Sequence, residues 1–124
     1  MPKLPLNAKI NALNEAVAFF NSHYCNLCPR NCNIDRSQKS GYSGALDKIV
    51  IYSAFLHQGE EPGISAKAGS GTIFFSGCNL KCVYCQNYQF SHTINGQIIS
   101  VEELAQLFIR LEQSNAANIN LVTP

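Results

Sequence analysis

Two tight groups of cysteines constrain this chain more than any other feature of its 124 residues. All six cysteines lie in two short segments, "CNLCPRNC" and "GCNLKCVYCQN". The first trio is Cys25, Cys28 and Cys32, and the second trio is Cys78, Cys82 and Cys85. A secreted disulfide framework usually spreads its cysteines along the chain, whereas ligands of a metal or cluster are grouped in this way. We therefore interpret both segments as candidate metal-binding loops.

Composition and charge limit the classes of partner. Charged residues make up 14% of the chain and the formal net charge is +1, so no basic surplus favours nucleic acid. The segment "MPKLPLNAKI" lacks the long apolar run of a signal peptide, and no stretch of sequence is long and apolar enough to span a membrane. We therefore expect a cytoplasmic protein with reduced thiols, and neither nucleic acid nor membrane as its partner.

Hydrophobic spacing predicts two elements before the second trio. Residues 9–21, "KINALNEAVAFFN", are predicted to be helical, with Leu13, Val17 and Phe20 packed into the core. Residues 47–57, "DKIVIYSAFLH", are predicted to contain a strand, because β-branched and aromatic residues are concentrated there.

Residues 71–124 are predicted to form a β-α-β unit, which makes the fold class α/β. Residues 72–75 are apolar or β-branched on both faces, as in a strand of a parallel sheet. "TINGQII" carries Asn95 and Gly96, a strong turn signal. "NINLVTP" has the pattern of a second short buried strand, and the crossover between the two strands should be right-handed.

The helix of this unit is the clearest in the sequence, "SVEELAQLFIRLEQS". Ser100 is its expected N-cap, and Glu103 three residues later completes a capping box. The side chains expected on its packed face are Leu104, Phe108 and Leu111, with Leu107 beside them.

The second trio follows the first strand of this unit directly. Ligands gather at the carboxyl ends of parallel strands, and Gly77 lets the backbone turn tightly as it leaves the strand. A structural zinc almost always takes four protein ligands, and a saturated 4Fe-4S cluster takes a thiolate on each iron. Three local thiolates would leave one iron open for a substrate. A zinc knuckle with a distant fourth ligand remains the alternative.

The pattern Cys78-x3-Cys82-x2-Cys85 resembles the signature of the radical S-adenosylmethionine (radical SAM) enzymes. The resemblance implies a 4Fe-4S cluster on these cysteines, with S-adenosylmethionine chelating the open iron. It also implies reductive cleavage of that cofactor to a 5′-deoxyadenosyl radical, which abstracts hydrogen from a substrate. Tyr84, before the last cysteine, takes the place of the residue that lies near the adenine.

A wider resemblance covers residues 24–124 and is to uncharacterised relatives of pyruvate formate-lyase activating enzyme. It rests on "FLHQGEEPGIS", "GSGTIFFSGCNLKCVYCQNY", "ISVEELAQLF", "NINLVTP" and the N-terminal "CNLCPRNCNIDR". It implies that residues 71–124 begin a partial (βα) barrel, TIM-like in form, and that residues 1–70 are an N-terminal helix and cysteine-rich extension. A full (βα)8 barrel runs to about 250 residues, and the partial barrel that the resemblance implies has about six of its eight units. We therefore expect the chain to be a fragment of a longer polypeptide, inactive by itself.

The first trio has two open interpretations. It could bind zinc or a second iron-sulfur cluster, with His23, His57 or Ser43 as a fourth ligand. It could also remain as reduced, unliganded thiols. Relatives often carry a cysteine where this chain has Ser43, and another where it has Gly63.

Two more residues are candidates for cofactor binding. Asn87 follows the second trio and could hydrogen-bond the cluster sulfurs or the cofactor, or else cap the loop with its amide. Thr123 ends the second strand, and the resemblance implies that this segment contacts the methionine amino group of the cofactor.

The remaining polar residues favour ordinary structural roles. Glu60 and Glu61 could act in acid/base catalysis, but adjacent carboxylates on a Gly/Pro loop usually face water. We expect His92 to be exposed to solvent and His57 to be partly buried.

Two functions are consistent with these observations. The first is a radical SAM enzyme, reduced by a flavodoxin or ferredoxin, with a protein such as a glycyl radical enzyme as its candidate substrate. The second is a non-enzymatic zinc or iron-sulfur module that serves structure or electron transfer. Binding of S-adenosylmethionine at the cluster separates the two.

Overall fold

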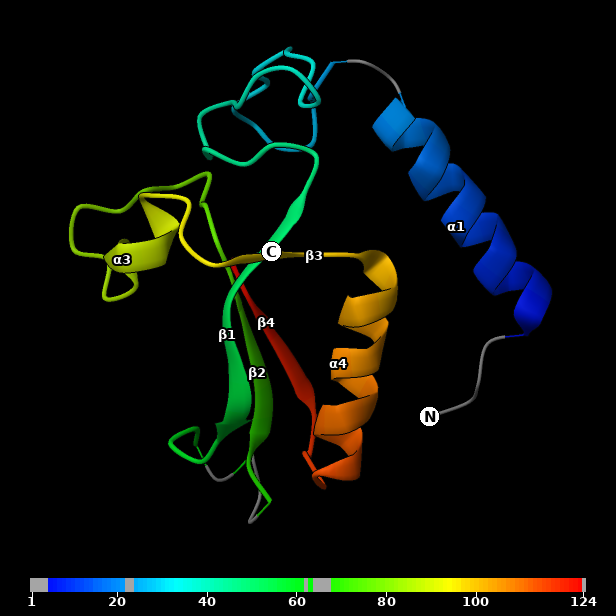
Figure 1. The fold of residues 1–124 in the computed structure, drawn as a ribbon, viewed down its shortest axis with the longest axis vertical. Coiled ribbons are helices and arrows are strands. Elements are labelled where there is room, and N and C mark those ends of the chain that lie inside the picture. Colours follow the sequence, from blue (N-terminus) through cyan, green and yellow to red (C-terminus); the bar gives the residue numbers. More distant parts are fainter. Residues whose placement is uncertain (1–4, 22–23, 62, 64–67, 124) are drawn as a thin grey trace.

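The computed structural model describes residues 5–21, 24–61, 63 and 68–123. Helix α4 covers one face of a four-stranded sheet whose strands lie in the order β3-β1-β2-β4 (Figure 1). The elements are α1 (Leu6–Asn21), β1 (Ile49–His57), β2 (Ser70–Phe75), α3 (Tyr88–Ser91), β3 (Gln97–Ile99), α4 (Val101–Gln113) and β4 (Ile119–Val122).

The sheet is mixed. β2 pairs in parallel with β4, from Gly71 opposite Ile119 to Phe74 opposite Val122, with α4 between them in the chain. This is the β-α-β arrangement expected for residues 71–124. β1 is antiparallel to both β2 and β3, so the cysteine-rich extension contributes a central strand to the same sheet.

β2 is buried on both faces, as its sequence predicts: Thr72 is 1% exposed and Ile73 is 0% exposed. Ile73 packs with Ile51 of β1 and Leu111 of α4 to form the core. The other side chains predicted on the packed face of α4 lie against this core, namely Leu104, Leu107 and Phe108.

The capping box at the start of α4 is confirmed. The backbone N–H of Glu103 donates to Ser100 Oγ at 3.1 Å, and the backbone N–H of Ser100 donates to Glu103 Oε2 at 2.7 Å. These bonds satisfy N–H groups that a helix terminus otherwise leaves without partners, so α4 begins at Val101.

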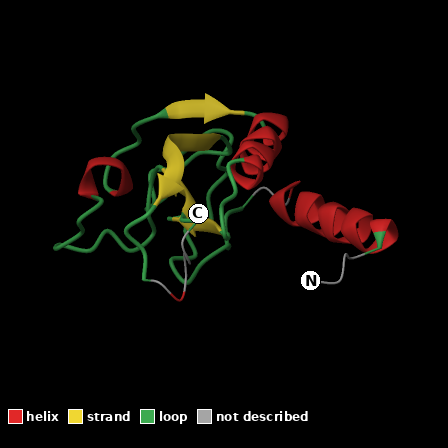
Figure 2. Ribbon diagram, turned by 90° about the horizontal axis from the view of Figure 1, so that it is seen from below, coloured by secondary structure: helices red, strands yellow, loops and turns green. Residues whose placement is uncertain are grey.

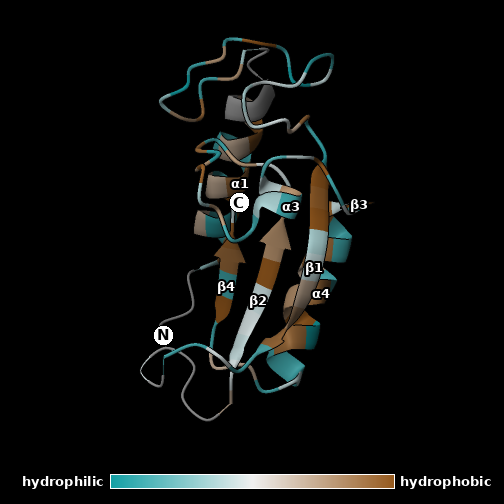
Figure 3. Cartoon of the chain, turned by 90° about the vertical axis from the view of Figure 1, so that its left-hand side faces the viewer, coloured by the Kyte–Doolittle hydropathy of each residue, from teal (hydrophilic) through white to brown (hydrophobic). Residues whose placement is uncertain are grey.

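The other face of the sheet carries an aromatic cluster. Figure 3 views the sheet from this side, with α4 behind the strands. Phe90 of α3 stacks on Tyr52 with ring centroids 4.5 Å apart and meets Phe74 edge-on at 5.5 Å. Phe55 stacks on Phe74 at 5.6 Å. Aromatic pairs of this kind add to the free energy of burial, and here they attach α3 to the sheet.

Helix α1 forms as predicted, but its predicted packing is wrong. Leu13 is 60% exposed and Val17 is 48% exposed, while the side chain of Phe20 lies outside the described residues. Figures 1 and 2 show α1 set apart from the sheet. The spacing of a hydrophobic stripe predicts which side chains share a face, but not whether another element covers it. No helix in the described part of the chain is both long and apolar enough to cross a membrane.

The segment predicted as a turn also contains a short strand. Gly96 has φ +142°, and a Cβ there would collide with the carbonyl group of Ile51, so the bend requires glycine. The next residues form β3, which pairs with β1. Ile98 is 67% exposed, and a three-residue strand offers too little pattern for prediction.

Candidate metal centre

The second trio begins where β2 ends, at the carboxyl end of a parallel strand pair, as predicted. Gly77 has φ +91°, and its N–H donates to the carbonyl of Phe90 at 2.7 Å. A Cβ at Gly77 would lie 2.9 Å from the carbonyl oxygen of Ser43, so both conformation and space require glycine. Cys78 follows, and its N–H donates to the same Ser43 oxygen at 3.2 Å.

The three cysteines of the second trio lie on one loop, residues 76–87, which we call the cluster loop. Lys81 adopts φ +50°, and the N–H of Cys85 donates to the carbonyl of Cys82 at 3.1 Å. The N–H of Leu80 points to the sulfur of Cys78 at 3.4 Å. All three thiols are free and half-buried.

The donor chemistry of this loop fits an iron-sulfur cluster, because soft thiolates select such clusters or zinc, and N–H···S contacts stabilise thiolates. The side chains themselves do not converge on one point. Among the described residues, no three Cys, His, Asp or Glu side chains are arranged to hold a metal ion. The fold therefore gathers the second trio on one loop without closing a ligand set.

Tyr84 projects from the cluster loop into solvent. Its side chain is 91% exposed, and that of Val83 beside it is 98% exposed. Large apolar side chains between two cysteines of one loop contribute nothing to the core at this exposure. Tyr84 is therefore free to pack against a bound molecule.

Asn87 and Thr123 have distinct structural settings. Asn87 is the N-cap of α3, but its side chain makes no capping hydrogen bond, so the capping alternative is not what the structure shows. Thr123 has φ +52°, and its hydroxyl donates to the carbonyl of Phe75 at 2.6 Å. This bond ties the end of β4 to the end of β2, next to the start of the cluster loop.

The first trio lies on a loop made of tight turns. The N–H of Cys25 donates to the carbonyl oxygen of Ile34 at 2.8 Å, and the N–H of Asn33 donates to the carbonyl oxygen of Cys25 at 3.0 Å. The N–H of Tyr42 points to Cys32 Sγ at 3.5 Å. His23, one candidate for a fourth ligand, lies outside the described residues.

The two cysteine segments share one cavity of about 1190 Å³. The whole first trio, Cys78 and Thr123 line it. Nothing in the sequence predicted this proximity, because the two trios are separated by more than forty positions, roughly the length of a supersecondary unit.

One hydrogen bond from its own loop and one from the cluster loop act on Cys28. A hydrogen bond from the backbone N–H of Arg30 lowers the pKa of the Cys28 thiol, and a further bond from the side chain of Asn79 lowers it too. Hydrogen bonds to a thiolate favour the charged form, which is the form that binds metals.

The adjacent carboxylates and His57 were expected to have ordinary structural roles. Glu61 is exposed, as expected, but Glu60 does not simply face water, because Asn120 Nδ2 of β4 donates to its carboxylate at 3.3 Å. His57 is partly buried, as predicted, and meets the ring of Phe55 edge-on.

Three further positions from the sequence remain, and the first of them, His92, differs from expectation. His92 was expected in solvent, but it is half-buried and its Nε2 has no partner among the described residues. It directly follows α3, whose attachment to the sheet draws the ring inward. Ser43 uses its hydroxyl to accept the N–H of Ala45 at 3.2 Å, while Gly63 is exposed.

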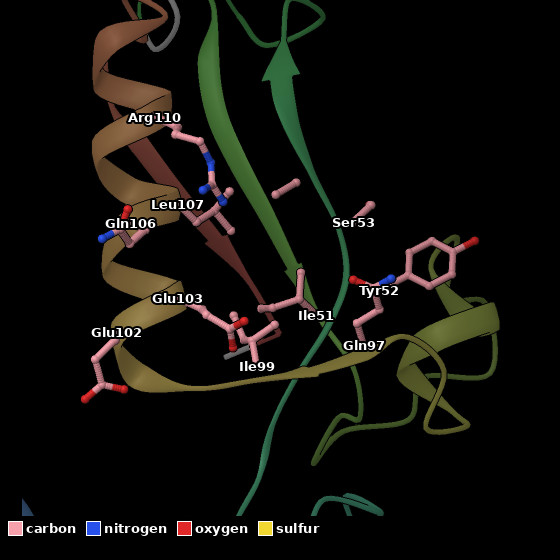
Figure 4. A pocket seen from close by; sticks show the side chains of 11 residues that line it. Ile51, Tyr52, Ser53, Gln97, Ile99, Glu102, Glu103, Gln106, Leu107 and Arg110 are labelled. Atoms are coloured by element: carbon pink, nitrogen blue, oxygen red, sulfur yellow. The ribbon is translucent and has the colours of Figure 1, made fainter.

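A second recess of about 750 Å³ lies between α4 and β1 (Figure 4). Arg110, Leu107 and Glu103 of α4 face Ile51 and its neighbours across it. None of the predicted ligand or cofactor residues lines this recess. The cysteine cavity is therefore the candidate site.

Sequence reasoning missed Arg30 and Ser91, whose side chains contact the cluster loop. Arg30 donates from Nε to the carbonyl of Asn79 at 2.9 Å, and Ser91 Oγ lies 3.3 Å from Cys85 Sγ. The first contact joins residues 49 positions apart, so no local pattern could reveal it. Ser91 follows Cys85 by six residues, but α3 was not predicted, so its position was not either.

Comparison with known proteins places the second trio in a family. Residues 58–123, which contain the second trio but not the first, match the model of the 4Fe-4S single cluster domain. The uncharacterized protein MJ0674 of Methanocaldococcus jannaschii is 33% identical over 105 residues, which cover 79% of this chain and 30% of that protein. No solved structure matches. The chain therefore belongs to the 4Fe-4S single cluster domain family.

Proposed function

We propose that this chain forms the cluster and cofactor end of a radical SAM enzyme. One observation carries the proposal. The segment that matches the cluster domain contains three cysteines, Cys78, Cys82 and Cys85, and all three lie on the loop that follows β2. A 4Fe-4S cluster held by these three would keep one iron without a protein thiolate. That iron is where S-adenosylmethionine would bind.

The chain's own residues would bind and orient the cofactor. When bound, the cluster would supply the electron that cleaves S-adenosylmethionine to a 5′-deoxyadenosyl radical for hydrogen abstraction. The exposed ring of Tyr84 would pack on the adenine. Asn87, with an amide that caps nothing, is suited to hydrogen-bond the cofactor. Thr123 would contact the cofactor through its backbone, because its hydroxyl already donates to the carbonyl of Phe75.

The barrel remains part of the proposal. The parallel pair of β2 and β4 with α4 between them would be the first unit of a partial (βα) barrel. Residues 1–70 would form the extension, which joins the same sheet through β1. Ligand sites of such barrels lie at the carboxyl ends of the strands, where the cluster loop and Thr123 are.

The finer assignment is to relatives of pyruvate formate-lyase activating enzyme. It includes an electron donor such as flavodoxin or ferredoxin, and a glycyl radical enzyme as the candidate protein substrate. It also leaves the first trio as a second metal site for zinc or another cluster. The chain spans 30% of the length of the relative it matches, so substrate and partners of the whole protein belong to this proposal.

Anaerobic reconstitution tests the proposal. The reconstituted protein should hold about four iron and four sulfide on the second trio. Addition of S-adenosylmethionine should change the electron paramagnetic resonance spectrum of the reduced cluster. In a longer polypeptide that carries this segment, dithionite should then produce 5′-deoxyadenosine, whereas the 124-residue chain alone should not. The Cys82→Ala protein should lose both, whereas Cys32→Ala, in the first trio, should keep the cofactor-induced spectral change.

A non-enzymatic iron-sulfur module is the second candidate, because the family description names a cluster and no reaction. In that case the reconstituted protein would hold a redox-active cluster whose spectrum S-adenosylmethionine leaves unchanged. Continued production of 5′-deoxyadenosine by the Cys82→Ala protein would rule out the radical SAM assignment.

A further inference from the structure

The buried hydroxyl of Ser91 faces one of the cluster-loop cysteines. Ser91 ends α3, its side chain is 0% exposed, and its Oγ lies 3.3 Å from Cys85 Sγ. Within the described part of the chain, Cys85 Sγ is the hydrogen-bond partner of the Ser91 hydroxyl. A buried hydroxyl normally finds a hydrogen-bond partner, so the contact with sulfur accounts for its polar group.

Ser91 is held in place by a rigid frame around it. The hydroxyl of Ser76, at the end of β2, donates to the carbonyl of Phe90 at 3.1 Å, and the N–H of Gly77 donates to the same oxygen at 2.7 Å. Phe90 is 5% exposed and stacks on Tyr52. The residue before Ser91 is therefore fixed both to the start of the cluster loop and to the sheet.

The chemistry of the cysteine decides which atom donates. A cysteine that ligates iron is a thiolate, which accepts hydrogen bonds and has no proton to give. Ser91 must then donate its O–H to Cys85 Sγ. Hydrogen bonds to the sulfurs are one of the factors that set the reduction potential of an iron-sulfur cluster.

The direction of the effect follows from charge. Reduction adds an electron to the cluster and its thiolates, and a hydrogen bond strengthens as its acceptor becomes more negative. A donor at Cys85 therefore stabilises the reduced state more than the oxidised state. Its presence raises the reduction potential and makes the electron easier to load.

We propose that Ser91 is a positioning residue that donates a hydrogen bond to the Cys85 thiolate and raises the reduction potential of the cluster. The inference rests on the part of the proposed function that assigns the cluster to the second trio. It does not depend on cleavage of S-adenosylmethionine, so the two can fail separately.

The test compares Ser91→Ala with a matched control in reconstituted protein. Ser70→Ala removes another fully buried serine hydroxyl, which bonds to Asn118 at the opposite end of β2. We expect Ser91→Ala to shift the potential to more negative values. At a fixed potential near the wild-type midpoint, the ratio of reduced to oxidised cluster should fall roughly three- to tenfold, because only part of the free energy of the hydrogen bond differs between the two oxidation states. Ser70→Ala should leave that ratio unchanged while lowering the thermal stability.

A second measurement keeps the proposal falsifiable if Ser91→Ala does not fold. In D₂O, the reduced wild-type cluster should show hyperfine coupling to one exchangeable deuteron that Ser91→Ala removes and Ser91→Thr keeps. The Ser91→Thr protein, which retains a hydroxyl donor, should have a potential close to that of wild type. A wild-type cluster without this coupling, or an unchanged potential and coupling in a folded Ser91→Ala protein, would overturn the inference. A shifted potential in a cluster whose spectrum S-adenosylmethionine leaves unchanged would support the inference and contradict the enzymatic proposal instead.

Discussion

Arg30 holds the cluster loop to the first cysteine segment through Asn79, whose carbonyl oxygen accepts from the guanidinium Nε at 2.9 Å. The same guanidinium lies over the ring of Tyr42, 3.9 Å from its centroid, and Lys81 Nζ lies 5.3 Å from that ring. The extension and the cluster loop are therefore attached by a bond that needs the planar, forked donor of arginine.

Replacing Arg30 with alanine should loosen the cluster loop. Loss of one hydrogen bond of about 1 kcal/mol predicts about fivefold faster release of iron to a chelator from the reconstituted protein. Arg30→Lys keeps the charge but lacks Nε, so iron should leave this protein nearly as fast as it leaves Arg30→Ala. Arg110→Ala, on α4 and away from the cysteines, is the control. Equal release rates for wild type and Arg30→Ala would show that the contact does not hold the loop.

The helix cap offers a prediction about stability alone. Ser100→Ala removes the acceptor for the N–H of Glu103, and should lower the free energy of unfolding by about 1 kcal/mol. Urea denaturation of the metal-free protein measures it. Ser37→Ala, an exposed serine in a turn of the extension, should change stability less. A Ser100→Ala protein as stable as wild type would mean that the cap contributes nothing to the fold.

The elements around the second trio were predictable because their signals are local. Ile73 and its neighbours are apolar or β-branched on both faces of the strand. Ser100 and Glu103 together indicate the start of a helix within four residues. The position of Cys78 after a buried strand then follows from the order of the elements.

The contacts that surround the cluster loop were not predictable from pattern. Arg30 meets Asn79 across 49 positions, and Ser91 reaches Cys85 from a four-residue helix too short to show a period. The hydrophobic stripe of α1 was visible, but whether Leu13 is covered depends on tertiary packing. His92 was misjudged because polar neighbours in sequence say little about the packing of a ring.

Tyr84 should contribute to cofactor binding and not to stability. Because its ring is 91% exposed, Tyr84→Ala should leave the unfolding midpoint unchanged. If the ring packs on the adenine, the substitution should raise the dissociation constant for S-adenosylmethionine about fivefold or more, equivalent to about 1 kcal/mol. Isothermal titration of the reconstituted protein measures this. Tyr88→Ala, whose side chain is 58% exposed on α3, is the matched control. Equal affinities for Tyr84→Ala and wild type would remove Tyr84 from the site.

Cys28 should react as a thiolate at lower pH than an ordinary cysteine. The backbone N–H of Arg30, and next the side chain of Asn79, lower the pKa of its thiol. The thiolate therefore persists as the pH falls, and is lost only when the pH passes below the lowered pKa. In metal-free protein, the rate of alkylation of Cys28 by iodoacetamide, followed by mass spectrometry, should reach its half-maximal value at a lower pH than that of a cysteine in an unstructured peptide. Asn79→Ala should move this midpoint upward, because one of the stabilising hydrogen bonds is gone. A midpoint that matches the peptide in both proteins would show that the two loops do not meet at Cys28.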